Sequence, residues 1–513
     1  MGAREGFTRR DVLRAGGAGA LALGVGGCVS EDFEQDVSRD PDAPNVLLIV
    51  TDSTRADYIG AYNPDSIAKT PNLDALARES LRFELAVPES MPTGPVRRCL
   101  LTGMRGFPFR DWVESPPLPA EPGWTPIGDD QPIFTEVLGK ADVTTAYCTD
   151  NPFLISTRFA RFRRTLDLAR PQYSQGAYRA FNKPFDRPAP RSEVEEYLLP
   201  ALSDTVEVER LRGHVGWNAI FRRRERDYSA ARVVRGGMQA LDEVAKDGRP
   251  FFLGVDSFDP HEPFDAPKAF VIAASGSEAK GIEKQGITPI QPFDTPSNRL
   301  ETIEVDDDTL DLIRELYAAE ISYADEWIGR LLNKLDDMRL ADETVVYYLS
   351  DHGITLGEHG VIGKAAALPH YHIYKVPYMI RDPRGRRAGE TSGYFGSTHD
   401  VPSTILATMG VKAPGIMDGE DLSVLFEGRD PPQRPYWTAC YADTVIAGDG
   451  RYLLMANIVG KSRRLFDTEK DPRELEDVAG AHPEIVETLW KALVDDAGGS
   501  LPMFGQEAGV LGG

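Results

Sequence analysis

Uninterrupted apolar runs that end near an acidic residue constrain the fold of this chain more than any other feature of its sequence. Val46–Val50 form one such run and precede Asp52, and Val345–Leu349 form a second and precede Asp351. A strand buried on both faces of a parallel sheet shows this pattern, because neither face meets water. Between the runs, Leu310–Met338 carries apolar residues at the spacing of an amphipathic helix.

Strand-like and helical segments alternate from Val46 to about Ala407. This alternation predicts an α/β fold with a doubly wound, mostly parallel sheet flanked by helices. Beyond it the sequence changes to short strand-like runs such as Arg451–Met455, followed by a predicted helix over about Pro483–Asp495. We therefore expect a main domain over residues 45–407 and a small C-terminal α+β subdomain with a separate antiparallel sheet over residues 408–513.

Two acidic residues and a histidine follow the predicted strands directly. In open α/β sheets ligands bind at the carboxyl ends of the strands, where Asp52, Asp351 and His352 are expected. Carboxylate oxygens and imidazole nitrogens are ligands of hard and borderline divalent cations. Asp52 could equally cap a helix N-terminus. The spacing alone does not bring the three residues together, so the sheet topology must do so.

A Thr-Gly-Pro-Val-Arg segment at residues 93–97 combines a hydroxyl, a turn and a cation at the start of a predicted helix. Thr93 would supply an oxygen nucleophile, and Arg97 a fixed cation beside an anionic substrate. A free threonine hydroxyl is a poor nucleophile, so a nearby metal ion would have to activate it. Thr-x-Pro turns also begin many helices without any catalytic role.

The composition excludes some classes of partner. The chain has 513 residues and a formal charge of -23, from 57 Lys and Arg against 80 Asp and Glu. Such an acidic protein is a poor ligand for nucleic acid, and we expect no nucleic-acid partner. Its 41% hydrophobic and 27% charged residues are typical of a soluble globular protein with a sizeable core.

The N-terminal residues have the order of an export signal. A twin-arginine motif within Thr8–Arg14 precedes the small apolar run Ala15–Gly27, and a lipobox-like sequence ends at Cys28. We expect residues 1–28 to be a twin-arginine, lipoprotein-type signal and residues 29–44 to be a tether. The protein would then lie outside the cytoplasm, either lipid-anchored to the outer face of the cell membrane through Cys28 or secreted.

Three further cysteines, Cys99, Cys148 and Cys440, are widely spaced and form no Cys-x-x-Cys motif. A thiolate zinc site is therefore excluded. One disulfide is possible outside the cell, but the spacing selects no pair, and buried free thiols are the default expectation.

Several short motifs follow one another in a defined order. They are Asn45–Asp57, Thr70–Asp74, Thr93-x-Pro95-x-Arg97 with Leu100–Gly103, Asp259–Phe264, Ser350–Gly353 with Leu356–Gly360 and Lys364, Thr398–Thr404, and Leu465–Pro472. In this order they resemble the landmarks of the sulfatase family, a branch of the alkaline phosphatase superfamily. The resemblance extends from residue 45 to about residue 493 and implies an alkaline phosphatase-like catalytic domain.

The resemblance also assigns roles to residues. It implies one divalent cation, Mn²⁺, Zn²⁺ or Ca²⁺, with metal ligands Asp52, Thr93, Asp351 and His352. It implies Thr93 as the nucleophile, and as partners of the substrate's charge it implies Arg97, His261 and Lys364. A second metal ion of the alkaline phosphatase kind would need ligands at spacings that this chain lacks.

The departures from the family pattern bear on the mechanism. Usual sulfatases carry Cys or Ser where Thr93 stands and convert it to formylglycine, which Thr cannot become. Cys99 offers no substitute, because no Pro or Arg follows it at the required offsets. Ser53 stands where many sulfatases have a further Asp ligand, and residues 149–152 lack a Lys and a His that contact sulfate esters. His352 replaces a frequent Asn, which favours Mn²⁺ or Zn²⁺.

We therefore expect a metal-dependent hydrolase that acts on phosphodiester, phosphonate or sulfate esters through Thr93, with a small-molecule, glycan or lipid ester as substrate. Two alternatives stay open from the sequence. One is a phospho-headgroup transferase of the cell envelope. The other is a catalytically silent binding protein on a sulfatase-like scaffold, against which the intact predicted metal ligands argue.

Overall fold

The computed structural model describes residues 38–108, 123–172, 190, 222–262, 264–275, 307–360, 362–364 and 370–501. The predicted signal, residues 1–28, and most of the predicted tether lie outside these ranges. Within the described part of the chain, no helix is both long and apolar enough to cross a membrane.

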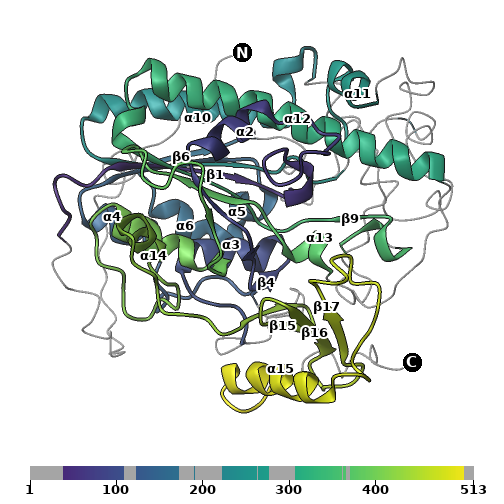
Figure 1. The fold of residues 1–513 in the computed structure, drawn as a ribbon. Helices are drawn as coiled ribbons and strands as arrows, with labels where there is room; N and C mark the ends of the chain where they lie inside the picture. The colour runs from purple at the N-terminus through teal and green to yellow at the C-terminus, as the bar shows by residue number, and fades with distance from the viewer. Residues whose placement is uncertain are drawn as a thin grey trace.

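An eight-stranded mixed sheet forms the centre of the molecule (Figure 1). Its strands, in spatial order, are β12 (Thr391–Ser392), β2 (Leu81–Phe83), β11 (Tyr378–Arg381), β8 (Thr344–Ser350), β1 (Asn45–Thr51), β7 (Phe251–Ser257), β5 (Thr144–Thr149) and β6 (Leu168–Pro171). Among these strands, β11 alone runs antiparallel to its neighbours. The predicted α/β class with a mostly parallel sheet is confirmed.

Helices cover both faces of this sheet. Figure 1 shows one layer made of α2 (Pro71–Arg78), α10 (Ser229–Asp247) and α12 (Asp307–Asp337). The opposite layer contains α3 (Thr93–Thr102), α4 (Phe134–Lys140), α5 (Pro152–Ile155), α6 (Ala160–Arg164) and α14 (Asp400–Thr408). Two separate clusters of buried apolar residues fill the space between the sheet and these layers. Strands buried on both faces need apolar residues at every position, which is why β1 and β8 read as continuous runs.

Short elements complete the main domain. They are β3 (Ala86–Val87) paired with β13 (Gly396–Ser397), β9 (Thr355–Leu356) paired with β10 (Ile362–Gly363), and the helices α11 (Lys268–Ser275) and α13 (Tyr371–Tyr374). The loop that contains β9 and β10 leaves the carboxyl end of β8 and carries Lys364.

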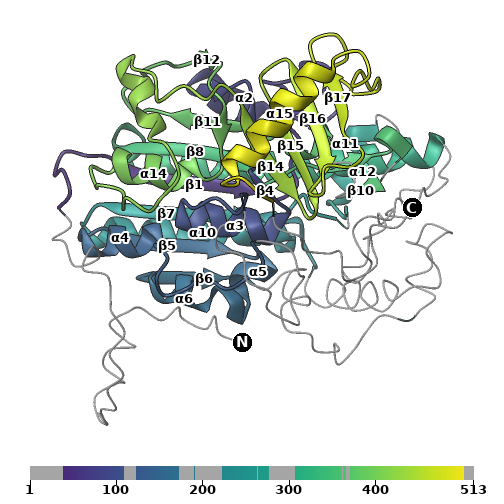
Figure 2. The ribbon, with the colours of Figure 1, turned by 90° about the horizontal axis from the view of Figure 1, so that it is seen from below.

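A second sheet lies beside the main one, covered by α15 (Pro483–Asp496) (Figure 2). Its strand order is β17 (Arg464–Asp467), β16 (Tyr452–Asn457), β15 (Thr444–Gly448), β14 (Trp437–Tyr441) and β4 (Ser90–Met91). Strands β14 to β17 pair antiparallel, as expected for the C-terminal subdomain. The sheet is separate from the main one, as expected, but it is not confined to residues 408–513, because β4 comes from the main domain and pairs parallel with β14.

Candidate active site

Strands β1, β7 and β8 end at the same edge of the main sheet. Thr51, the last residue of β1, is level with Ser257 of β7 and with Ser350 of β8. The residues that follow, Asp52 and Asp351, are therefore neighbours although 299 positions separate Thr51 from Ser350. Both carboxylates are fully buried. The parallel register is what brings the two predicted metal ligands together.

Asp52, Asp351 and His352 form a compact group of possible metal ligands. One ligand atom from each residue lies within 4.8 Å of the other two, and all three residues are buried. Nδ1 of His352 lies 2.9 Å from the carbonyl oxygen of Gly353, an arrangement that leaves Nε2 facing the carboxylates. Oδ2 of Asp351 has no well-aligned hydrogen-bond donor among the residues that the structure describes, although Nη1 of Arg97 lies 3.0 Å away. Buried carboxylate oxygens with an imidazole nitrogen fit a divalent cation.

The protonation states of this group depend on burial and on its neighbours. Burial raises the pKa of Asp52 well above its usual value, and the adjacent Asp351 carboxylate raises it further. Burial acts in the same direction on Asp351, but the neighbouring His352 and Arg97 outweigh it and lower the pKa of Asp351. Burial lowers the pKa of His352. A neutral imidazole can donate its lone pair to a cation, as a metal site requires.

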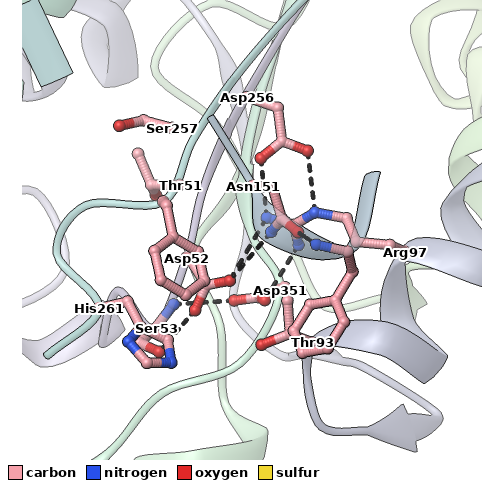
Figure 3. A network of polar contacts seen from close by, with 12 residues as sticks. Thr51, Asp52, Ser53, Thr93, Arg97, Asn151, Asp256, Ser257, His261 and Asp351 are labelled. Atoms are coloured by element: carbon pink, nitrogen blue, oxygen red, sulfur yellow. Dashed lines mark hydrogen bonds and ion pairs between the residues drawn. The ribbon is translucent and has the colours of Figure 1, made fainter. Parts of the chain in front are cut away.

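Thr93 stands at the first position of α3 and faces this group. Its Oγ1 lies 3.1 Å from Nε2 of His352, and its residue is 2% exposed. In Figure 3 the Thr93 hydroxyl is directed toward the carboxylates of Asp52 and Asp351. The N-terminus of a helix carries partial positive charge, which stabilises an anionic oxygen. The predicted nucleophile therefore lies next to the predicted metal ligands.

Arg97 comes from the next turn of α3 and contacts carboxylates from three strand ends (Figure 3). Nε and Nη2 donate to Asp256 at 2.8 and 2.9 Å, Nη1 lies 3.0 Å from Asp351, and Nη2 lies 3.7 Å from Asp52. Burial opposes ionisation, but these carboxylates outweigh it and raise the pKa of Arg97. The guanidinium is 1% exposed, so it balances charge behind the possible metal ligands.

His261 and Lys364 reach the site from two loops. His261 follows β7, and its ring stacks on Phe258 with centroids 4.1 Å apart. Nζ of Lys364 donates to Oγ of Ser53 at 3.3 Å and to a carboxylate oxygen of Glu262 at 3.0 Å. In the view of Figure 3, His261 lies beside Ser53, on the other side of the carboxylates from Thr93.

Four residues of the site escaped the sequence prediction. Asp256 holds Arg97, Glu262 holds Lys364, and Asn151 donates to Asp52 at 3.4 Å. Ser53 donates to Asp52 at 2.7 Å and has a positive φ of 60°, a conformation that non-glycine residues seldom adopt. One signal was available for Asp256, since an acid at the end of a buried apolar strand needs a partner.

The other histidines near the site pack against neighbouring groups. His359 and His370 stack with ring centroids 3.5 Å apart, and Nδ1 of His370 lies 2.7 Å from the Glu474 carboxylate. His399 lies 2.8 Å from the hydroxyl of Ser397. These contacts give the three histidines packing and hydrogen-bonding roles.

Arg55 and the cysteines likewise stand apart from the reacting groups. Arg55 forms ion pairs with Asp57 and with Glu358. All three cysteines that the structure describes are buried and form no disulfide.

Comparisons with known proteins place the chain in a family. The model of the Sulfatase family matches residues 44–411. The multifunctional alkaline phosphatase superfamily protein PehA of Trinickia caryophylli is 28% identical over 429 residues, 75% of this chain and 77% of that protein. The choline-sulfatase of Rhizobium meliloti is 26% identical over 456 residues, 85% of this chain and 82% of that protein.

A similar fold occurs in a solved structure. The phosphonate monoester hydrolase of Agrobacterium radiobacter superposes with a TM-score of 0.62 at 20% identity, covering 89% of this chain and 95% of that one. Because the family model matches residues 44–411, the chain belongs to the sulfatase family, a family of ester hydrolases within the alkaline phosphatase superfamily.

Proposed function

We propose that this protein hydrolyses phosphodiester, phosphonate or sulfate esters, with Oγ1 of Thr93 as the nucleophile. The observation that carries the proposal is the position of Thr93 at the start of α3, with Oγ1 3.1 Å from His352. Sulfatase-family enzymes use a divalent metal ion, and Asp52, Asp351 and His352 are the residues that would hold it. Such an ion supplies Lewis-acid stabilisation of negative charge and lowers the pKa of a nearby hydroxyl.

The side chains would act on the ester in two stages. Thr93 Oγ1 attacks phosphorus or sulfur, the bond to the leaving oxygen breaks, and the Thr93 proton ends on that oxygen. Lys364 and His261 would balance the charge that develops on the reacting group. Water then splits the Thr93 ester, returns a proton to Oγ1 and releases the acid. Arg97, held by Asp256, keeps the Asp52 and Asp351 carboxylates in place.

A comparison of Thr93→Ala with Thr93→Ser tests the nucleophile. Both variants would be assayed in Mn²⁺ with 4-nitrophenyl esters: a phosphodiester, a phosphonate and a sulfate. We expect Thr93→Ala to lose at least about 10³-fold in kcat and Thr93→Ser to retain measurable turnover. Acid quenching during turnover should leave a mass increase on the peptide that contains Thr93. Turnover of Thr93→Ala at the rate of the parent would refute the proposal.

The same residues bear on the two alternatives, a binding protein without activity and a transferase. A binding protein without activity would not need Asp52, Asp351 and His352 buried together with Thr93 in contact. Transfer to an acceptor alcohol in place of water would appear as a second product in the same assay.

We also propose that the N-terminal segment exports the protein and attaches it to lipid at Cys28. Its support is the order of the twin-arginine motif, apolar run and lipobox in the sequence. Cell fractionation of the full chain and of Cys28→Ala tests this. The parent should fractionate with membranes and the variant should not, and a cytoplasmic parent would contradict the proposal.

A further inference from the structure

Glu262 is a buried carboxylate that lies between the two side chains expected to meet the substrate's charge. Its Oε2 accepts a hydrogen bond from Nζ of Lys364 at 3.0 Å and lies 3.4 Å from Nδ1 of His261. The Glu262 residue is 4% exposed, and the Lys364 side chain is 12% exposed. A pair so far removed from solvent is weakly screened, so the charge of Glu262 acts on Lys364 and on whatever binds beside it.

Lys364 is connected to the reacting centre through one serine. Its Nζ lies 3.3 Å from Oγ of Ser53, and the Ser53 hydroxyl donates to Asp52 at 2.7 Å. An ester held at Thr93 and Asp52 would therefore meet an ammonium that already has a carboxylate partner. Arg97, a second cation of the site, is committed to Asp52, Asp256 and Asp351. Among the residues that the structure describes, the site thus offers little positive charge that is not already paired.

We propose that Glu262 sets the charge selectivity of the site and restricts it to esters whose reacting group carries one negative charge. Sulfate monoesters, phosphodiesters and phosphonate monoesters carry one such charge, whereas phosphate monoesters carry nearly two above their second pKa of about 6. This inference rests on the proposed function for the position of the bound ester. Glu262 acts through Lys364 and is a positioning residue.

The physical reason is repulsion between like charges at low dielectric. A second charge on the reacting group would lie within reach of Lys364 and therefore close to the Glu262 carboxylate. Like charges placed together in a desolvated site are strongly disfavoured, and this rejects the wrong ligand even when its shape fits. Removing the Glu262 charge would leave Lys364 free to pair with the second charge of a phosphate monoester.

Ligand binding to a protein that cannot turn over tests this directly. In a Thr93→Ala background loaded with Mn²⁺, calorimetry at pH 8 would give Kd for phenyl sulfate, with one charge, and for phenyl phosphate, with two. We expect Glu262→Gln to shift the ratio of the two Kd values toward phenyl phosphate by at least about tenfold. Glu262→Asp keeps the charge and should restore the parental ratio. Glu136→Gln removes a partly exposed carboxylate on α4 that pairs with Arg161, and it is the matched control.

The same variants on the Thr93 parent give a second readout, the ratio of kcat/KM for 4-nitrophenyl sulfate and 4-nitrophenyl phosphate. A purely structural role of Glu262 would weaken both ligands alike and leave both ratios unchanged, which would overturn the inference. Equal ratios in Glu262→Gln and in Glu262→Asp would also overturn it. Absence of turnover in the parent would refute the proposed function, while the binding ratio would still decide the role of Glu262.

Discussion

Replacing Arg97 by methionine tests whether this buried cation holds the site together. Methionine retains much of the aliphatic volume but leaves the carboxylates of Asp52, Asp256 and Asp351 without their shared partner. Removing one partner of a buried ion pair costs about 3–5 kcal/mol, because the remaining charge stays desolvated. We expect Arg97→Met to lower the free energy of unfolding by about that amount. The measurement is urea unfolding in EDTA, followed by tryptophan fluorescence.

A double-mutant cycle with Asp256 separates the ion pair from other effects. Asp256 accepts two hydrogen bonds from Arg97 and one from the Tyr147 hydroxyl at 2.9 Å, and asparagine can keep the last of these. Asp256→Asn removes one of the carboxylate charges that Arg97→Met would leave without a partner. The double variant should therefore be at least about 1 kcal/mol more stable than the sum of the two single losses predicts.

The pH dependence provides an independent check on the same cycle. Burial already raises the pKa of Asp256, against the effect of Arg97, and loss of Arg97 would raise it further. A carboxyl whose pKa is higher in the folded than in the unfolded state destabilises the fold above its unfolded pKa. The loss of unfolding free energy caused by Arg97→Met should therefore become smaller as the pH falls from 8 to 5. A loss below about 1 kcal/mol, or strictly additive losses, would refute this reasoning.

Three further perturbations probe the surroundings of the site. His352→Ala should reduce Mn²⁺ or Zn²⁺ affinity by at least about 100-fold, measured by competition with a chelator. Gly353→Ala would place a Cβ onto the carbonyl oxygen of His372 and should abolish soluble, metal-binding protein, measured by yield and metal content. Burial acts against ionisation of Glu358, but Arg55 together with His372 and the backbone N–H of Leu356 outweighs it and lowers the pKa to about 2. The Glu358 charge then contributes up to about 3 kcal/mol to the free energy of unfolding above pH 4.5, and this contribution is lost as the pH falls toward 2. Glu358→Gln should remove this pH dependence, as measured by urea unfolding.

The controls follow from the same contacts. Gly393→Ala is the matched control for the glycine variant, since a Cβ there meets nothing within 4 Å. Its yield should equal that of the parent. Unchanged chelator competition in His352→Ala would exclude this histidine as a ligand, and an equal stability loss at pH 7 and pH 3 would contradict the ion-pair account of Glu358.

The strands of the main sheet could be predicted because both of their faces are buried against apolar side chains. Val46–Val50 and Val345–Leu349 lie inside β1 and β8, and the predicted helix over residues 310–338 corresponds to α12 at Asp307–Asp337. Periodicity reports how each segment is buried, and it is local in the sequence. It also indicated that acidic residues follow the strands.

The partners of the buried charges could not be predicted, because strand order and register decide them. Arg97 and Asp256 are 159 positions apart, and they meet because the fold places α3 at the carboxyl end of β7. Lys364 and Glu262 are 102 positions apart and come from two different loops. No local pattern encodes such pairs, and the family resemblance indicated the cations without their carboxylate partners.

The pairing of β4 with β14 shows that the C-terminal subdomain is part of the catalytic unit. Met91 pairs with Tyr441 just two residues before Thr93, so β14 fixes the chain from which the proposed nucleophile projects. The hydroxyl of the same Tyr441 donates to the carbonyl oxygen of Lys364 at 3.2 Å. One strand of the second sheet thus holds the backbone at the proposed nucleophile and at the predicted anion-binding lysine. Arg105, just beyond α3, is tied in turn to Asp496 at the end of α15 at 2.8 Å. Loosening this sheet would therefore displace Thr93 and Lys364 together. The predicted domain boundary near residue 408 marks a change in the sequence pattern, but residues on both sides of it support the site.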